Sequence, residues 1–187
     1  IGTDPMYAEF METSSISKIP TAVLPNSAKP WLLAAVRESL MSPLIVVTSG
    51  PERARTLGNE LRVILGDAAP VYVLPERDAL PYERLVADHA TTSQRLQVLS
   101  VLARSEKSPS PPLIVTSMVG ASQTTLAYSK FVENSQSISV GDTVSLEEVL
   151  ASWIRLGYSM EHVVEVPGSF SRRGGILDIY PPGDLLP

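Results

Sequence analysis

Apolar and polar positions follow two different periods along the first part of the chain. Short runs of consecutive apolar residues, many of them β-branched, are typical of strands covered on both faces, and they occur at residues 43–49, 71–74 and 113–117. Elsewhere apolar residues recur at every third or fourth position, which predicts helices over residues 27–41, 50–66 and 93–104. Because strands alternate with helices, we predict an α/β domain with a parallel sheet over residues 19–122.

The ends of the first two predicted helices carry residues that suit helix termini. Asn26 or Ser27 is expected to cap the first helix, in which Pro30 is tolerated only in the first turn. Ser49 is expected to cap the second helix, and Gly66 suits its exit. These residues set the expected boundaries of both helices.

The pattern changes after Gln123, where apolar runs become shorter and more polar. We therefore predict a small α+β domain over residues 123–187. Ser145 and Glu148 have the spacing of a capping box, and Gly157 suits the exit of the helix that they begin. Two short strands are expected, at residues 161–167 and 174–181.

Composition excludes several kinds of site. The 187 residues carry a formal net charge of −5, no cysteine and two histidines, so disulfides, thiolate catalysis and cysteine- or histidine-rich metal sites are excluded. We expect no metal and no cofactor. An acidic chain does not grip DNA phosphates with its whole surface, so a basic region would have to be local.

Targeting signals are also missing from the pattern. No run approaches the roughly 20 apolar residues of a membrane span. Residues 1–18 lack the basic flank and apolar core of a signal peptide, and they are expected to be partly tag residues or disordered. We therefore expect a cytoplasmic protein without a membrane partner.

An α/β domain invites a test for a nucleotide site, and the candidate loop lies at residues 22–31. A phosphate loop needs glycines whose N–H groups surround the phosphates, a lysine, and a hydroxyl for magnesium. This segment has no glycine, and its lysine, Lys29, precedes Pro30. We interpret Asn26, Ser27 and Lys29 as a degenerate loop without nucleotide. We find no other pattern of catalytic residues and predict no enzyme activity for this chain.

A paired positive charge stands out near the C-terminus. Arg172 and Arg173 precede Gly174 and Gly175, whose backbone permits a bulge or a turn with positive φ. The planar guanidinium donates pairs of hydrogen bonds to carboxylates, so acidic groups of a partner are a natural target. From the pattern alone, a solvated turn remains an alternative. Phe170 suits either an interface anchor or the core.

Alternation predicts which side chains share a face of the strand that follows the glycines. We expect Leu177 and Ile179 on the face opposite Asp178 and Tyr180.

Three segments together resemble the Mfd family of transcription-repair coupling factors and, more distantly, the excision-repair protein UvrB. The arginine segment is carried by Gly168, Phe170, Arg173, Gly174, Gly175, Asp178, Tyr180 and Pro181. An earlier segment is carried by Leu80, Pro81, Tyr82, Glu83, Arg95 and Leu96. The third is the Gly-Tyr segment over residues 154–168, and all three occur in the order and spacing of the family.

The resemblance implies a UvrB-like module, in which a degenerate helicase-like α/β domain without an ATP site carries a small UvrA-interaction domain. Arg173 occupies the family's UvrA-contacting arginine. A second arginine usually follows the Gly-Tyr pair, but Ser159 stands there, and Arg172 is an additional charge. In the family, RNA polymerase and DNA bind through other regions. The alternatives are a UvrB-like, ATP-dependent helicase fragment that binds nucleotide, and a module that binds DNA through the same arginines.

Overall fold

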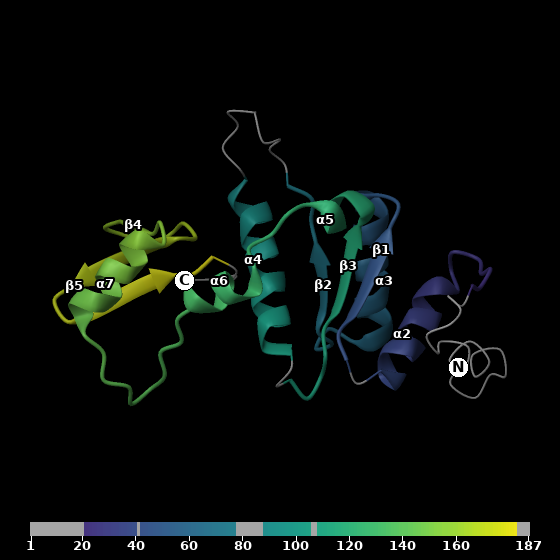
Figure 1. Ribbon diagram of the computed structural model, residues 1–187, viewed down its shortest axis with the longest axis horizontal. Coiled ribbons are helices and arrows are strands. Elements are labelled where there is room, and N and C mark those ends of the chain that lie inside the picture. The colour runs from purple at the N-terminus through teal and green to yellow at the C-terminus, as the bar shows by residue number, and fades with distance from the viewer. Residues whose placement is uncertain (1–20, 41, 78–87, 106–107, 183–187) are drawn as a thin grey trace. The chain divides into compact units, whose positions relative to one another are not determined.

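The structure is a computed structural model that describes residues 21–40, 42–77, 88–105 and 108–182. The chain divides into two compact units, which are described separately (Figure 1). The first unit contains the chain up to Glu76 and the segment Arg104–Ser122, and the second contains Arg77–Ala103 and the chain from Gln123 onward. Residues 77–103 thus group with the C-terminal part of the chain. The division into domains at 19–122 and 123–187 stays a prediction.

The first unit is built on a parallel, three-stranded sheet with the order β1-β3-β2. Its strands are β1 (Leu44–Thr48), β2 (Val71–Leu74) and β3 (Leu113–Ser117), so all three strands expected from the apolar runs are present. Both outer strands pair with β3 in parallel, and Leu113 is the register partner of Leu44 on one side and of Val71 on the other. The prediction of an α/β fold with a parallel sheet is confirmed.

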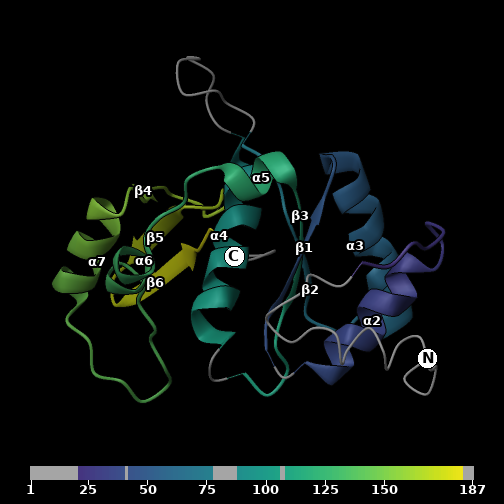
Figure 2. The same ribbon diagram turned by 45° about the vertical axis from the view of Figure 1, so that its right-hand side comes forward.

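Two helices, α2 (Lys29–Ser39) and α3 (Pro51–Leu65), lie on the same side of this sheet (Figure 2). The core between these layers is aliphatic and contains Ala34, Ala54, Leu57, Leu61, Val71, Leu113 and Val115. A short helix, α5 (Met118–Ser122), follows β3 directly. The edge strand β1 exposes Ile45 and Val47, whose relative exposures are 57% and 44%.

The helix ends differ from expectation in their caps. The residue before α2 is Ala28, and neither it nor the expected Asn26 or Ser27 caps the helix with a side chain. Asn26 instead accepts a hydrogen bond from the Lys29 ammonium at 2.9 Å. Pro30 lies in the first turn, as expected.

The cap of α3 also differs from the expected one. Gly50, not Ser49, precedes the helix and makes no side-chain bond, because extended backbone at Gly50 puts Ser49 one residue too far away. Gly66 follows the helix with a φ of 89°, as its predicted role at the exit requires.

The second unit begins with α4 (His89–Arg104), whose last residue belongs to the first unit. This helix starts four residues earlier than the expected Ser93. The Asp88 carboxylate accepts the N–H groups of Ala90 and Thr91 at 3.3 and 3.4 Å, and it thereby caps the helix at the earlier position. A six-residue helix, α6 (Tyr128–Glu133), was not expected and buries none of its residues.

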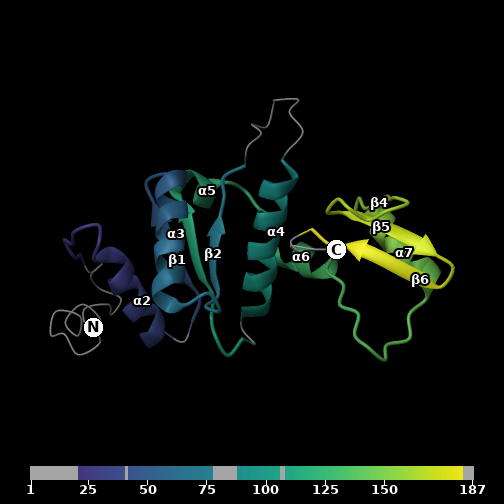
Figure 3. The same ribbon diagram turned by 180° about the vertical axis from the view of Figure 1, so that it is seen from behind.

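The C-terminal part of the second unit pairs α7 (Leu146–Arg155) with a small sheet of order β4-β5-β6. Its strands are β4 (Ser159–Met160), β5 (Ser169–Arg173) and β6 (Ile176–Tyr180). Helix α7 covers one face of this sheet, as opposite views show (Figures 1 and 3). Ser145 caps the helix by accepting the N–H of Glu148, and Gly157 follows it with a φ of 91°.

The prediction of a strand at residues 161–167 is wrong. These residues form an irregular connection, and the strand lies at β5 instead. Val163 and Val166 are exposed, so the alternation that suggested a strand has no core to face. Phe170 of β5, in contrast, packs with Val149 and Trp153, and the Trp153 and Phe170 ring centroids are 5.5 Å apart.

Candidate partner-binding hairpin

The two arginines stand at the end of a tight hairpin. Strands β5 and β6 are antiparallel, and Gly174 and Gly175 form the loop between them. Gly174 has a φ of 64° whereas Gly175 has none in the positive range, the pattern of a type II′ turn. The glycines therefore form the expected turn with positive φ. The arginines, however, belong to the last two positions of β5 and not to the turn.

The register of the hairpin sends the two arginine side chains to opposite faces. Arg172 is the cross-strand partner of Leu177, and Arg173 is the partner of Ile176. Leu177 and Ile179 pack against the cluster under α7, as the predicted alternation requires. Side chains directly opposite each other share a face. Arg172 therefore lies on the α7 face of the sheet, and Arg173 lies on the outer face.

Arg173 is exposed and has an intramolecular acidic partner. Its Nη2 donates to Oδ2 of Asp178 at 2.5 Å, diagonally across the hairpin. The side chains of Arg173 and Asp178 are 70% and 41% exposed. Exposed ion pairs contribute at most about 1 kcal/mol, so this pair orients the guanidinium without removing it from solvent.

Arg172 supports the turn. Its Nε donates to the backbone oxygen of Gly174 at 3.2 Å, and its side chain is exposed. Among the residues that the structure describes, no carboxylate lies within ion-pair distance of Arg172.

Phe170 belongs to the core. It is 1% exposed and packs against Trp153 of α7, so of the two interpretations the structure supports that of a core residue. The interpretation of Phe170 as a partner-binding anchor is corrected, because a side chain buried beneath α7 presents no surface to a partner. Ser159 is exposed in β4, and its N–H donates to the carbonyl oxygen of Gly168.

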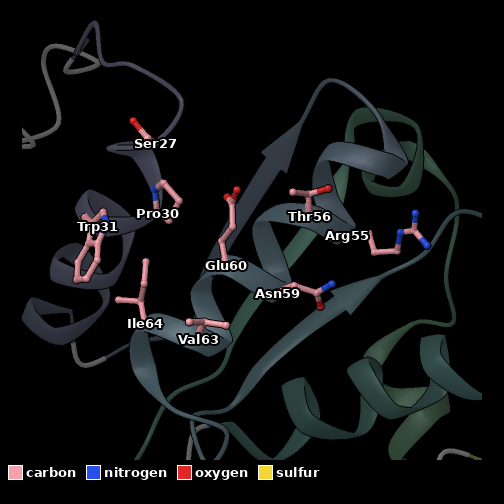
Figure 4. A pocket seen from close by; sticks show the side chains of 9 residues that line it. All are labelled: Ser27, Pro30, Trp31, Arg55, Thr56, Asn59, Glu60, Val63 and Ile64. Carbon is pink, nitrogen blue, oxygen red and sulfur yellow. The ribbon is translucent and has the colours of Figure 1, made fainter.

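The degenerate phosphate loop borders an open groove of about 620 Å³ between α2 and α3 (Figure 4). Most of the surface that faces this groove is apolar. The groove is lined by Ser27, Pro30, Trp31, Arg55, Thr56, Asn59, Glu60, Val63 and Ile64. The lining arginine is bound to Glu52, and Lys29 is bound to Asn26. These groups form no cradle of N–H groups and lysine such as phosphates require.

Arg95 of the earlier family segment has a structural role. It is buried, and its Nη1 donates to Oε1 of Gln123 at 3.3 Å. Burial lowers the pKa of the Arg95 guanidinium, and the positive charge of Arg77 lowers it further. The backbone N–H of Arg77 donates to the same Gln123 oxygen, at 2.8 Å. The other residues of that segment, Leu80, Pro81, Tyr82 and Glu83, lie outside the described residues.

Comparison with known proteins assigns the hairpin to a class. Residues 137–185 match the family model of the UvrB interaction domain, so the hairpin and α7 lie within this class of domain. Within the described part of the chain, every helix is too short or too polar to cross a membrane.

Curated relatives extend the match over most of the chain. The transcription-repair-coupling factor of Mycobacterium tuberculosis is 36% identical over 165 residues, which cover 87% of this chain and 13% of the relative. Those of Myxococcus xanthus and Bacillus subtilis are 28% and 26% identical over 97% and 86% of this chain. The chain belongs to the transcription-repair-coupling factors and corresponds to their N-terminal, UvrB-like module. It spans 13–15% of the length of these relatives.

Proposed function

We propose that this chain is the UvrA-recruiting module of a transcription-repair-coupling factor and acts in nucleotide excision repair at stalled transcription complexes. The observation that carries the proposal is the exposed guanidinium of Arg173, held on a regular hairpin inside the UvrB interaction domain. The hairpin would dock onto acidic groups of UvrA. RNA polymerase and DNA are proposed partners of other regions of the whole protein.

A local contact suits the charge of this part of the chain. Residues 123–187 contain four basic and eight acidic residues, a net charge of −4. Two of the four basic residues are Arg172 and Arg173, side by side. A guanidinium pairs with a carboxylate through two parallel hydrogen bonds, and this geometry favours discrete acidic side chains. The acidic surroundings disfavour the long polyanion of a nucleic acid.

We also propose that the module itself performs no chemistry and descends from a helicase-like domain without an ATP site. The absence of glycine from residues 22–31 and the pairing of Lys29 with Asn26 support this proposal. Calorimetry with magnesium and ATP tests it, with no binding expected. Micromolar binding would favour the alternative of a UvrB-like fragment that retains nucleotide.

Titration of UvrA against the chain tests the recruiting role. We expect wild-type protein to bind and Arg173→Ala to bind at least tenfold more weakly, because one truncated charge pair at an interface costs about 2–5 kcal/mol. Arg155→Ala is the matched control, since Arg155 is an exposed arginine of α7 outside the hairpin. Equal affinity of wild type and Arg173→Ala would remove Arg173 from the contact, and no binding by wild type would reject the recruiting role.

A further inference from the structure

The hairpin presents positive charge on both of its faces. Arg173 extends from the outer face of the hairpin. Arg172 extends from the opposite face, which α7 covers nearer to the start of β5. Both side chains are exposed. A partner surface that lies flat against the outer face meets Arg173 and Ile176 but has Arg172 behind the strands.

The residues at the tip of the hairpin are exposed to solvent. A Cβ atom built on Gly174 or Gly175 would meet no atom within 4 Å. Ile176, the first residue of β6, is 62% exposed. The aromatic core under α7 is centred on Phe170, three residues before the end of β5 at Arg173. Residues 172–176 at the end of the hairpin are therefore all exposed, whereas Leu177, opposite Arg172, packs against the cluster under α7.

The two arginines also differ in what they gain from a partner. Arg173 already has the carboxylate of Asp178, so a partner carboxylate competes with an existing bond. Arg172 has only the Gly174 carbonyl among the described residues, so a partner carboxylate adds a new ion pair. A new ion pair, in which a carboxylate replaces water at the guanidinium, stabilises the complex more than the exchange of one carboxylate partner for another.

We propose that the tip of the β5–β6 hairpin inserts into a cleft of the partner protein that has carboxylates on both walls, one wall facing Arg172 and the other facing Arg173. This inference rests on the proposed function and specifies the partner surface. Arg172 is then a specificity-determining residue equal to or greater than Arg173 in its effect, although the family resemblance is carried by Arg173. Docking on one flat face predicts instead that Arg172 contributes nothing.

The experiment is a calorimetric titration of UvrA with the full chain and its single and double variants. We expect Arg172→Ala to weaken binding at least tenfold and at least as much as Arg173→Ala. Because the two acidic walls are separate, we expect the effect of the double variant to approach the product of the single effects. Arg155→Ala is the control and should bind as wild type does.

Unfolding measurements on the same variants distinguish a structural role of Arg172 from a direct contact with UvrA. Its bond to Gly174 is on the surface, so we expect a thermal midpoint close to that of wild type and unchanged near-UV circular dichroism from Trp153. A loss of binding with these readouts unchanged supports a direct contact. A loss of binding that follows a loss of the folded signal would overturn it.

The outcomes distinguish this inference from the proposed function. Wild-type affinity of Arg172→Ala together with weak binding of Arg173→Ala would overturn the cleft and leave UvrA recruitment in place. Failure of the wild-type chain to bind UvrA would reject both. A parallel titration with a 30-base-pair duplex DNA is expected to show no submicromolar binding. Submicromolar binding that both alanine variants abolish would instead assign the hairpin to nucleic acid.

Discussion

Helix α3 of the first unit and the hairpin of the second unit surround their arginines differently. In the first unit, Arg53 and Arg55 of α3 form ion pairs with Glu60 and Glu52 of the same helix, and Arg37 of α2 donates to Ser110. In the hairpin of the second unit, and counting only described residues, Arg172 donates to a backbone oxygen and Arg173 pairs with one exposed carboxylate. A helix surrounds each side chain with neighbours from adjacent turns, whereas the end of a hairpin offers few. The arginines of α3 are thus paired within their own helix, whereas Arg172 at the end of the hairpin has no carboxylate partner among the described residues.

The cores differ as well. The first unit spreads its core over aliphatic residues of two helices and of strands β2 and β3. The second unit concentrates its buried cluster under α7 in Val149, Trp153 and Phe170. We therefore expect single substitutions in this cluster to affect the second unit more severely than single substitutions in the first core.

Phe170→Ala should have the largest effect. Truncation of a buried phenylalanine costs about 3–5 kcal/mol, and this one removes the ring that contacts Trp153. We expect loss of the near-UV signal of Trp153 and loss of UvrA binding. Thermal unfolding followed by circular dichroism measures the first, and calorimetry the second.

Leu61→Ala is the counterpart in the first unit. Leu61 is fully buried in the aliphatic core, and its truncation should cost about 2–5 kcal/mol while the hairpin keeps its structure. Where enough stability remains for the variant to fold, UvrA binding should persist. Loss of binding by a folded Leu61→Ala protein would show that the first unit takes part in the contact.

Gly58→Ala should destabilise the first unit by overpacking. A Cβ at this position of α3 would lie 2.5 Å from Cγ2 of Val73, and crowding of this kind costs about 1–3 kcal/mol. The double variant Gly58→Ala/Val73→Ala removes the crowding atom and should recover part of the loss. Chemical denaturation measures both variants. A single variant more stable than wild type would show that Val73 moves aside and that helix propensity dominates.

The turn glycines form a matched pair. Gly174→Ala places a Cβ on a residue with a φ of 64° at the first central position of the turn, and such a positive φ costs an L-residue about 1–3 kcal/mol. Gly175→Ala should be nearly neutral, because this residue lacks a positive φ and has open space around it. Thermal unfolding of the two variants measures the difference. Equal destabilisation by both would contradict the type II′ assignment.

Asp178→Asn should have the smallest effect. It removes the carboxylate that competes for Arg173, and exposed pairs contribute at most about 1 kcal/mol, so UvrA affinity should rise by no more than about fivefold. Calorimetry at low salt measures the change, with Asp142→Asn as a control outside the hairpin. Weaker binding would show instead that Asp178 holds Arg173 in its binding position.

Continuous apolar runs made the first sheet predictable. The three strands of the first unit are expected because runs of consecutive apolar residues are typical of strands covered on both faces. Only β3 is buried at every position, and the expectation of two covered faces is wrong for β1, which exposes Ile45 and Val47 at the edge of the sheet. The second sheet was missed in part because β5 contains a single apolar residue, Phe170. Ser169 and Ser171 are nevertheless buried, since their hydroxyls donate to the carbonyl oxygens of Val166 and His162. Hydrogen bonds between a side chain and the backbone of the preceding loop leave no periodic signal in the sequence.

The candidate site was only partly predictable for the same reason. The double glycine indicated a turn, and the resemblance singled out Arg173. The arginines occupy opposite faces because they lie in a strand. The apolar pattern predicts that strand at residues 161–167 and not at β5. The pairing of Arg173 with Asp178 likewise requires the register of β5 and β6.

The free side of β1 has a practical consequence for handling this protein. Within the described residues β1 pairs only with β3, so a row of backbone donors and acceptors faces outward beside Ile45 and Val47. Such an edge templates the addition of another strand, whether from a later part of the polypeptide or from a neighbouring molecule in concentrated solution. A lysine introduced at Val47 would make the purified chain less prone to self-association without touching the hairpin.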